Sequence, residues 1–368
     1  MQDINPFRFG TMWTDGDFRG EIAFRNMRVE FERVMAQYRG EVCEGFYLFG
    51  GQRVRIRIVG RELAEHFLRP FSHLQIGKDG FPSLRLSIDL WDVKKVSLDS
   101  QRQPLPADAG WTEKTVQSTD GRFVGQQLPN TASCLDREQN HIMAAISWHN
   151  QIFIYERAKP LARLLLNWHN DQDLQMIHAA LVARANHGIL FIGKSGSGKS
   201  TTSLACIDAG LGFLSEDYVS LELSEDGGFI GHSLYNSVFL KTDQLERFPA
   251  LAPYAIRGRL PHEEKSVIVL SQVYPERLKR AVPIRALVLP RVVDAPNLRI
   301  LPVAKGQTLL ALGPSSLLQI PNRGLGVRGF NKLAQLVQAV PSFRLEVGPD
   351  LSAIPRRLED LFAEISST

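Results

Sequence analysis

The sequence is poor in cysteine and contains no long apolar run, and each shortage excludes a class of protein. Its three cysteines, Cys43, Cys134 and Cys206, lie far apart and form no Cys-x-x-Cys pair. This spacing excludes a disulfide framework and a cysteine zinc site, and it suits a reducing compartment. No stretch approaches the roughly 20 apolar residues of a membrane helix, and the charged N-terminal segment lacks the apolar run of a signal peptide. We therefore expect a cytoplasmic protein with no membrane partner.

A strong excess of either charge is also lacking. The 368 residues include 43 Lys and Arg against 39 Asp and Glu, a formal net charge of +4. Basic residues such as Arg53, Arg55 and Arg57 alternate with apolar residues at strand spacing, whereas nucleic-acid binding usually requires basic residues gathered on one face. We therefore expect no nucleic-acid partner.

The length of the chain predicts two domains, because 368 residues exceed what one hydrophobic core usually organises. Residues 1–157 contain alternating apolar and polar runs, such as residues 84–90, and turn signals such as Gly50-Gly51, which predict a mostly β N-terminal domain of unknown role. Residues 158–368 mix apolar strands with helices and predict an α/β domain. The expected strands are 176–182, 189–192 and 284–289, and the expected helices are 30–37, 62–68, 160–169, 199–208, 331–339 and 354–365.

One segment matches a phosphate-binding motif at every fixed position. Residues 193–200 read Gly-Lys-Ser-Gly-Ser-Gly-Lys-Ser and fit Gly-x-x-x-x-Gly-Lys-Ser/Thr. The glycines let backbone N–H groups approach phosphate oxygens, and the helix expected from Lys199 adds unpaired N–H groups and a positive dipole end. The residues predicted to bind the nucleotide are Gly193, Lys194, Ser195, Gly196, Ser197, Gly198, Lys199, Ser200 and Thr201.

The surroundings of this motif support the same interpretation. An apolar strand at residues 189–192 precedes it and a helix follows it, which is the context that the motif requires. Lys199 can reach the β- and γ-phosphates, and the Ser200 hydroxyl can ligate Mg²⁺. The sequence therefore predicts ATP and Mg²⁺ as cofactors.

An acidic pair close behind the motif distinguishes among proteins with such loops. Glu216 and Asp217 follow Lys199 by only 17 and 18 residues, and no Leu-Ser-Gly-Gly-Gln signature of transporter ATPases is present. His178 precedes the motif, with a hairpin between them. This order and spacing resemble the HPr serine kinase/phosphorylase family and its HPr-kinase-related members, most specifically over residues 177–223.

The resemblance implies a fold, a chemistry and residue roles. The fold would be an α/β P-loop mixed sheet of the HPr kinase and phosphoenolpyruvate carboxykinase type, and the chemistry ATP-dependent phosphorylation of a hydroxyl. By position, Glu216 would be the base, where the family usually has Asp, and Asp217 would hold Mg²⁺ with Ser200. His178 falls on the family histidine. In the approximate place where the HPr-specific enzymes carry a Glu-x-x-Gly segment, this chain has Tyr235-Asn236-Ser237, which argues against HPr itself as the acceptor.

Further polar residues of the second domain are candidates for contacts with phosphate or acceptor. Arg291 follows the apolar strand 284–289 and could clamp phosphate oxygens together with Lys199. Lys265 is a second basic candidate, and Tyr235 with Asn236 could face the acceptor. The alternatives are surface ion pairs for Lys265 and Arg291 and ordinary hairpin residues for the other two.

Two functions remain open at this point. The first is an ATP-dependent kinase acting on a hydroxyl, in which Lys199 offsets phosphate charge and Glu216 and His178 act at the acceptor. The acceptor would be a serine of a protein or peptide, or a small molecule. The second is a nucleotide-sensing regulatory ATP-binding protein with little turnover.

Overall fold

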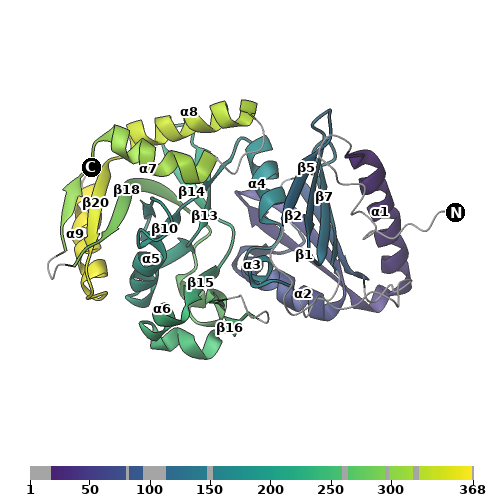
Figure 1. Ribbon diagram of the computed structural model, residues 1–368, viewed down its shortest axis with the longest axis horizontal. Coiled ribbons are helices and arrows are strands. Elements are labelled where there is room, and N and C mark those ends of the chain that lie inside the picture. Colours follow the sequence, from purple (N-terminus) through teal and green to yellow (C-terminus); the bar gives the residue numbers. More distant parts are fainter. Residues whose placement is uncertain are drawn as a thin grey trace. The chain divides into compact units, whose positions relative to one another are not determined.

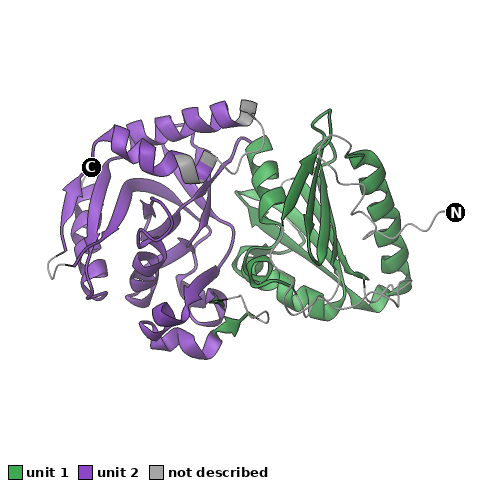
Figure 2. Ribbon diagram, viewed as in Figure 1, with its two compact units in different colours: residues 1–171, 255–267 green, residues 172–254, 268–368 purple. Residues whose placement is uncertain are grey.

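The computed structural model describes residues 18–79, 83–93, 113–146, 152–258, 264–294, 298–317 and 323–366 (Figure 1). The fold is mixed α/β, with helices packed on large mixed sheets. The chain divides into two compact units (Figure 2). Unit 1 comprises Met1–Asp171 and Ala255–Val267, and unit 2 comprises Gln172–Tyr254 and Ile268–Thr368. Helix α4 (Ala162–Asp171), at the start of the second predicted domain, belongs to unit 1.

Unit 1 is built on an eight-stranded sheet in the order β3-β1-β2-β4-β8-β7-β6-β5. β2 pairs in parallel with β4, and β4 with β8, whereas the other pairs are antiparallel. Helix α1 (Gly20–Gln37) packs its apolar side on the central strands, and α2 (Arg61–Leu68) packs on β1 and β2. The strands are β1 (Val42–Phe49), β2 (Gln52–Val59), β3 (Gln75–Ile76), β4 (Leu86–Asp92), β5 (Lys114–Gln117), β6 (Phe123–Leu128), β7 (Thr131–Asp136) and β8 (His141–Ile146).

Unit 2 is built on a nine-stranded mixed sheet in the order β12-β10-β11-β18-β14-β13-β9, with β20 beside β18 and β19 beside β20. β18 pairs in parallel with both β11 and β20. Helices α5 (Lys199–Asp208) and α9 (Ala353–Ser366) cover one face, and α7 (Lys305–Leu317) and α8 (Arg323–Ala339) cover the other. The strands are β9 (Gln175–His178), β10 (Ala180–Arg184), β11 (His187–Phe191), β12 (Gly212–Ser215), β13 (Tyr218–Leu223), β14 (Phe229–Ser233), β18 (Ala281–Val292), β19 (Ile300–Pro302) and β20 (Ser342–Val347).

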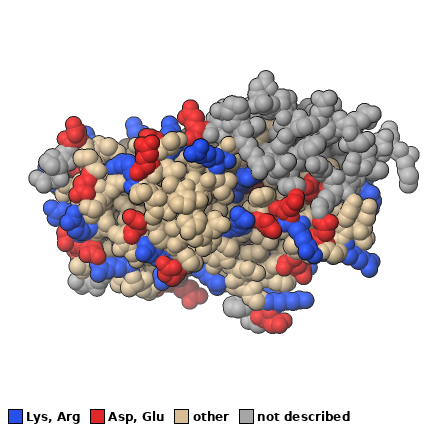
Figure 3. Space-filling view, turned by 90° about the horizontal axis from the view of Figure 1, so that it is seen from below, with Lys and Arg blue, Asp and Glu red and all other residues tan. Residues whose placement is uncertain are grey.

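The remaining elements are short. They are α3 (Ile154–Ala158), α6 (Thr242–Glu246), β15 (Ser237–Lys241), β16 (Ile256–Arg257) and β17 (Lys265–Val269). In the described part of the chain, every helix is too short or too polar to span a bilayer. On the face seen in Figure 3, the coloured Lys and Arg side chains are interspersed with Asp and Glu.

The expected strand at 176–182 is wrong as a single element. The structure divides it into β9, which pairs with β13, and β10, which pairs with β11 and β12. The break falls at Ala179, whose backbone N–H donates to Asp217 O at 3.0 Å. Because the two halves join different neighbours, the acidic segment that follows β12 lies beside the end of β9.

A buried carboxyl group connects the last two helices of unit 1. Glu156 in α3 is 6% exposed and accepts a hydrogen bond from Leu161 N at 3.1 Å. Leu161 has a φ of +56°, which is unusual for a residue with a branched side chain. Burial raises the pKa of Glu156 from 4.5 to about 7, because it disfavours the charged carboxylate.

The raised pKa of Glu156 predicts a pH-dependent stability of unit 1. The folded state keeps this proton between about pH 4.5 and 7 while the unfolded state loses it, so the free energy of unfolding falls as the pH rises through this window. The full shift corresponds to a loss of at most about 3 kcal/mol. We expect Glu156→Gln to remove most of this loss in urea unfolding at pH 5 to 8, while the exposed control Glu32→Gln keeps it. If the free energy of unfolding of Glu156→Gln fell with pH as steeply as that of the wild type, this account would be contradicted.

Candidate functional site

The motif loop, residues 193–198, connects the central strand β11 to helix α5. β11 lies between β10 and β18 and is almost wholly buried, so the sheet fixes where the loop begins. Gly193, Gly196 and Gly198 have φ values of +136°, +78° and +104°, which residues with a Cβ rarely adopt. The three glycines of the motif are therefore required by the backbone path itself.

Helix α5 begins at Lys199, the boundary that the sequence predicts. Gly198 caps it in the left-handed conformation, and its carbonyl accepts a hydrogen bond from Thr202 N at 2.9 Å. The first N–H groups of a helix have no partner within it and carry its positive dipole end. The end of β18 lies beside this point, since a Cβ on Gly198 would be 3.4 Å from Val292 Cγ2 and 3.7 Å from Pro290 Cβ.

Lys199 places a positive charge within the loop. It is only 6% exposed, and its Nζ donates to Gly193 O at 2.7 Å and to Lys194 O at 3.2 Å. The Oγ of Ser197 is buried and has no hydrogen-bond partner in the structure described. An ammonium, an unpaired hydroxyl and the N-terminus of α5 together suit an anionic ligand with several acceptor oxygens.

The acidic pair is held in a tight turn by Ser215, the last residue of β12. The Ser215 hydroxyl donates to Tyr218 O at 2.7 Å and accepts from Asp217 N at 3.2 Å. Glu216 is 7% exposed and accepts a hydrogen bond from Ser200 Oγ, in the first turn of α5. The structure therefore brings Glu216, and not Asp217, into contact with the serine predicted to hold Mg²⁺.

The Asp217 side chain points away from that of Glu216 and contacts His178 at the end of β9. Their Oδ1 and Nε2 atoms are 2.5 Å apart, and both side chains are partly exposed. The strands fix this approach, because β13 pairs with β9 so that Tyr218 lies opposite His178. The sequence-predicted residues Ser200, Glu216, Asp217 and His178 thus form two contacts, which are linked through the adjacent acidic pair.

Aromatic rings lie beside His178. The ring centroids of His178 and Tyr218 are 6.4 Å apart, and those of Tyr218 and Tyr235 are 6.5 Å apart. Tyr235 and Asn236 are both buried in the connection from β14 to β15, and Asn236 O accepts a hydrogen bond from Leu270 N. Sequence reasoning missed Tyr218 and Ser215, although both flank the acidic pair directly.

The other two basic candidates, Arg291 and Lys265, lie on different strands. Pro290 and Val292 approach Gly198, so strand alternation puts the Arg291 side chain on the opposite face of β18, in register with Glu346 of β20. Lys265 begins β17 and belongs to unit 1. The phosphate-binding roles of Arg291 and Lys265 stay predictions.

Among the residues described, no group of three His, Cys, Asp or Glu side chains could hold a metal ion. Mg²⁺ does not require such a cage, because it usually keeps waters and binds one or two protein ligands together with substrate phosphates. The neighbouring Ser200 and Glu216 oxygens are of the type that this ion prefers.

No protein-family model matches the chain, and no curated protein matches it. Among solved structures, the Hpr(Ser) kinase/phosphatase from Coxiella burnetii is similar with a TM-score of 0.27 and 14% identity, over 52% of this chain and 95% of that chain. A TM-score this low carries no argument about fold or function. The functional proposal therefore depends on the geometry of the loop and of the acidic pair.

The loop conformation predicts a specific sensitivity to substitution. Gly193→Ala would place a Cβ in a disfavoured backbone region and 3.0 Å from Ser197 Oγ. We expect it to lower the free energy of unfolding by about 1–3 kcal/mol in urea titrations. The matched control is Gly306→Ala in α7, where a Cβ would meet nothing within 4 Å and helix propensity favours Ala. Equal stabilities of the two variants would be evidence against the observed loop conformation.

Proposed function

We propose that the chain binds ATP with Mg²⁺ at the motif loop and transfers its γ-phosphoryl group to a hydroxyl acceptor. The observation that carries this proposal is the contact between Ser200 and Glu216 at the start of α5, next to the buried ammonium of Lys199. A carboxylate at this position is what separates a nucleotide site with a metal from a simple anion site. The proposal includes a sheet of the HPr kinase and phosphoenolpyruvate carboxykinase type.

Triphosphate binding follows from the donors of the loop. The backbone N–H groups at the start of α5 would surround the β-phosphate, and Lys199 Nζ would exchange its bonds to Gly193 O and Lys194 O for phosphate oxygens. The unpaired Ser197 hydroxyl would gain an acceptor. Bound Mg²⁺ would neutralise the developing charge on the transferred group.

The contacts favour roles for the acidic pair that are the reverse of those implied by the resemblance. Glu216 is buried and bonded to Ser200, which suits the residue that helps to hold the metal. Asp217 is partly exposed, and its contact with His178 orients its carboxylate. Asp217 would accept the acceptor's proton as the acceptor oxygen bonds to the γ-phosphorus, the bond from that phosphorus to the β,γ-bridging oxygen breaks and ADP leaves.

The acceptor is a hydroxyl of a protein, a peptide or a small molecule, and neither nucleic acid nor membrane is a proposed partner. Tyr218 and Tyr235 lie on the His178 side of the acidic pair. The partly exposed Tyr218 ring would flank an acceptor that approaches Asp217, and the buried Tyr235 ring would support it from behind. The partly exposed Asp217 and His178 leave the approach open from this side.

Nucleotide binding is tested with Lys199→Ala. Loss of the ammonium should weaken ATP binding about 10- to 150-fold in calorimetric titrations, because a charge-assisted contact to phosphate contributes about 1.5–3 kcal/mol. The control Lys279→Ala, an exposed lysine of the same unit, should bind as the wild type does. Unchanged affinity of Lys199→Ala would refute the proposed site.

If wild-type protein binds ATP but labels no hydroxyl acceptor from γ-labelled ATP, the sensor function replaces the kinase.

The two acidic roles are separated by metal dependence. Glu216→Gln should raise the Mg²⁺ concentration for half-maximal activity by about tenfold or more, since it removes a metal-side carboxylate. Asp217→Asn should lower kcat by about 10²–10⁴-fold with little change in metal dependence, since it removes the base. Glu225→Gln, an exposed turn acid, is the matched control. If Asp217→Asn changed the metal dependence and Glu216→Gln lowered kcat instead, Glu216 would be the base and Asp217 the metal ligand.

A further inference from the structure

Strand β18 extends past the end of its neighbour β11 and continues beside the motif loop. The last residue pair between the two strands is Phe191 with Val288, and Ile192 N donates to Val288 O at 2.9 Å. From there β18 runs on to Val292, paired with β20 alone. Residues 289–292 therefore lie along one side of the loop.

Val292 presents an apolar surface at the end of this strand. Its side chain is 64% exposed, whereas Pro290, two residues earlier, is buried. Both face the loop, since a Cβ on Gly198 would be 3.4 Å from Val292 Cγ2 and 3.7 Å from Pro290 Cβ. A single exposed valine is ordinary on a protein surface. This one, however, lies directly beside the N-terminus of α5, where the polyphosphate is proposed to bind.

The acidic pair lies on the other side of the loop. The sheet order is β12-β10-β11-β18, and the pairings make β12 and β18 run in the same direction as β11, so all three strands end at one edge. Glu216 follows β12, and Val292 ends β18. A polyphosphate over α5 with its terminal phosphate near Glu216 therefore directs its other end, which carries the nucleoside, toward Val292.

We propose that Val292 is the apolar contact for the nucleoside of the bound nucleotide. Because the direction of the polyphosphate comes from the proposed function, this role of Val292 rests on it. The nucleoside would cover the exposed side chain and remove apolar surface from water. An inorganic polyphosphate has no apolar part and gains nothing from Val292. The site thus selects nucleoside triphosphates over inorganic polyphosphates.

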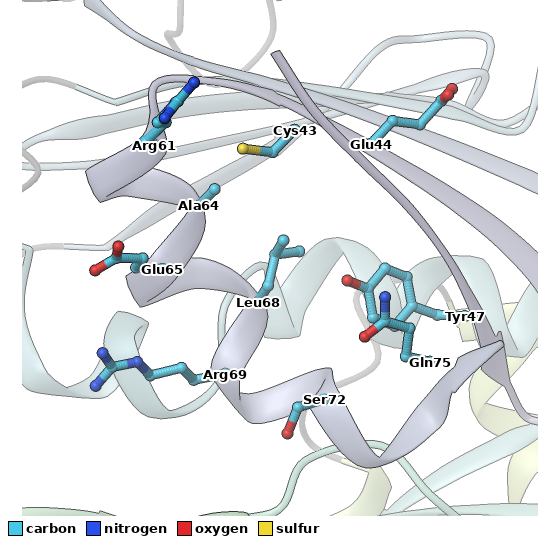
Figure 4. A pocket seen from close by; sticks show the side chains of 10 residues that line it. All are labelled: Cys43, Glu44, Tyr47, Arg61, Ala64, Glu65, Leu68, Arg69, Ser72 and Gln75. Atoms are coloured by element: carbon cyan, nitrogen blue, oxygen red, sulfur yellow. The ribbon is translucent and has the colours of Figure 1, made fainter. Parts of the chain in front are cut away.

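A pocket of about 480 Å³ between α2 and β1 in unit 1 does not provide an alternative place for the nucleotide (Figure 4). Its lining includes Arg61 and Arg69 but also Glu44 and Glu65, so the opposite charges balance. It offers a polyphosphate no excess of positive charge. At the loop, in contrast, the buried ammonium of Lys199 and the positive dipole end of α5 come together.

The role of Val292 is tested with Val292→Ala, by calorimetric titration of the full-length protein with ATP and with inorganic tripolyphosphate, both in Mg²⁺. The variant should bind ATP about three- to tenfold more weakly, because part of a buried apolar contact is lost. Its affinity for tripolyphosphate should equal that of the wild type. The matched control is Val327→Ala in α8, where the valine is also 64% exposed, and it should bind both ligands as the wild type does.

Val292→Trp provides a second readout, because a nucleobase stacks favourably on an aromatic ring. ATP should change the fluorescence of the added indole, measured as the difference from the wild type with its five native tryptophans. Tripolyphosphate should leave this difference unchanged.

Three outcomes would overturn the role of Val292. They are unchanged ATP affinity of Val292→Ala, equal weakening of both ligands by Val292→Ala, and an equal response of the added indole to both ligands. In each case ATP binding by the wild type leaves the proposed function standing. A wild type that binds neither ATP nor tripolyphosphate would instead remove the proposed function, and the role of Val292 with it.

Discussion

The hydrogen bonds of the Ser215 hydroxyl determine how the candidate site is arranged. By bonding to Tyr218 O and Asp217 N, this hydroxyl closes a turn that directs two adjacent carboxylates to different partners. Glu216 reaches Ser200 at the start of α5, and Asp217 reaches His178 at the end of β9. Without this turn, two like charges would compete for the same space, and repulsion between them would disfavour ionisation of one. The division of labour proposed for the pair depends on it.

Local signals allowed the loop and the start of α5 to be predicted from the sequence. The motif fixes the loop and the start of α5 because its glycines and its capping position are encoded within eight residues. The opposite directions of Glu216 and Asp217 could not be predicted in the same way. They depend on which strands pair with β9 and β12, and that pairing brings together residues distant in sequence.

The fold shows the same contrast between local and distant determinants. Helix α1 begins at Gly20, ten residues before the predicted helix, because Ala23, Phe24 and Met27 pack on the sheet although the sequence between them is polar. Helix α7 was not predicted, since its sequence contains two glycines and a proline, which usually interrupt helices.

The bonds that Lys199 makes to its own loop have a thermodynamic consequence. Because its ammonium already joins Gly193 O and Lys194 O, the side chain and the loop share one conformation before any ligand arrives. The conformational entropy of this long side chain is lost during folding, so an incoming polyphosphate would not have to order it. Under the proposed function, such a site would be preorganised, and binding would exchange internal carbonyl acceptors for stronger anionic ones.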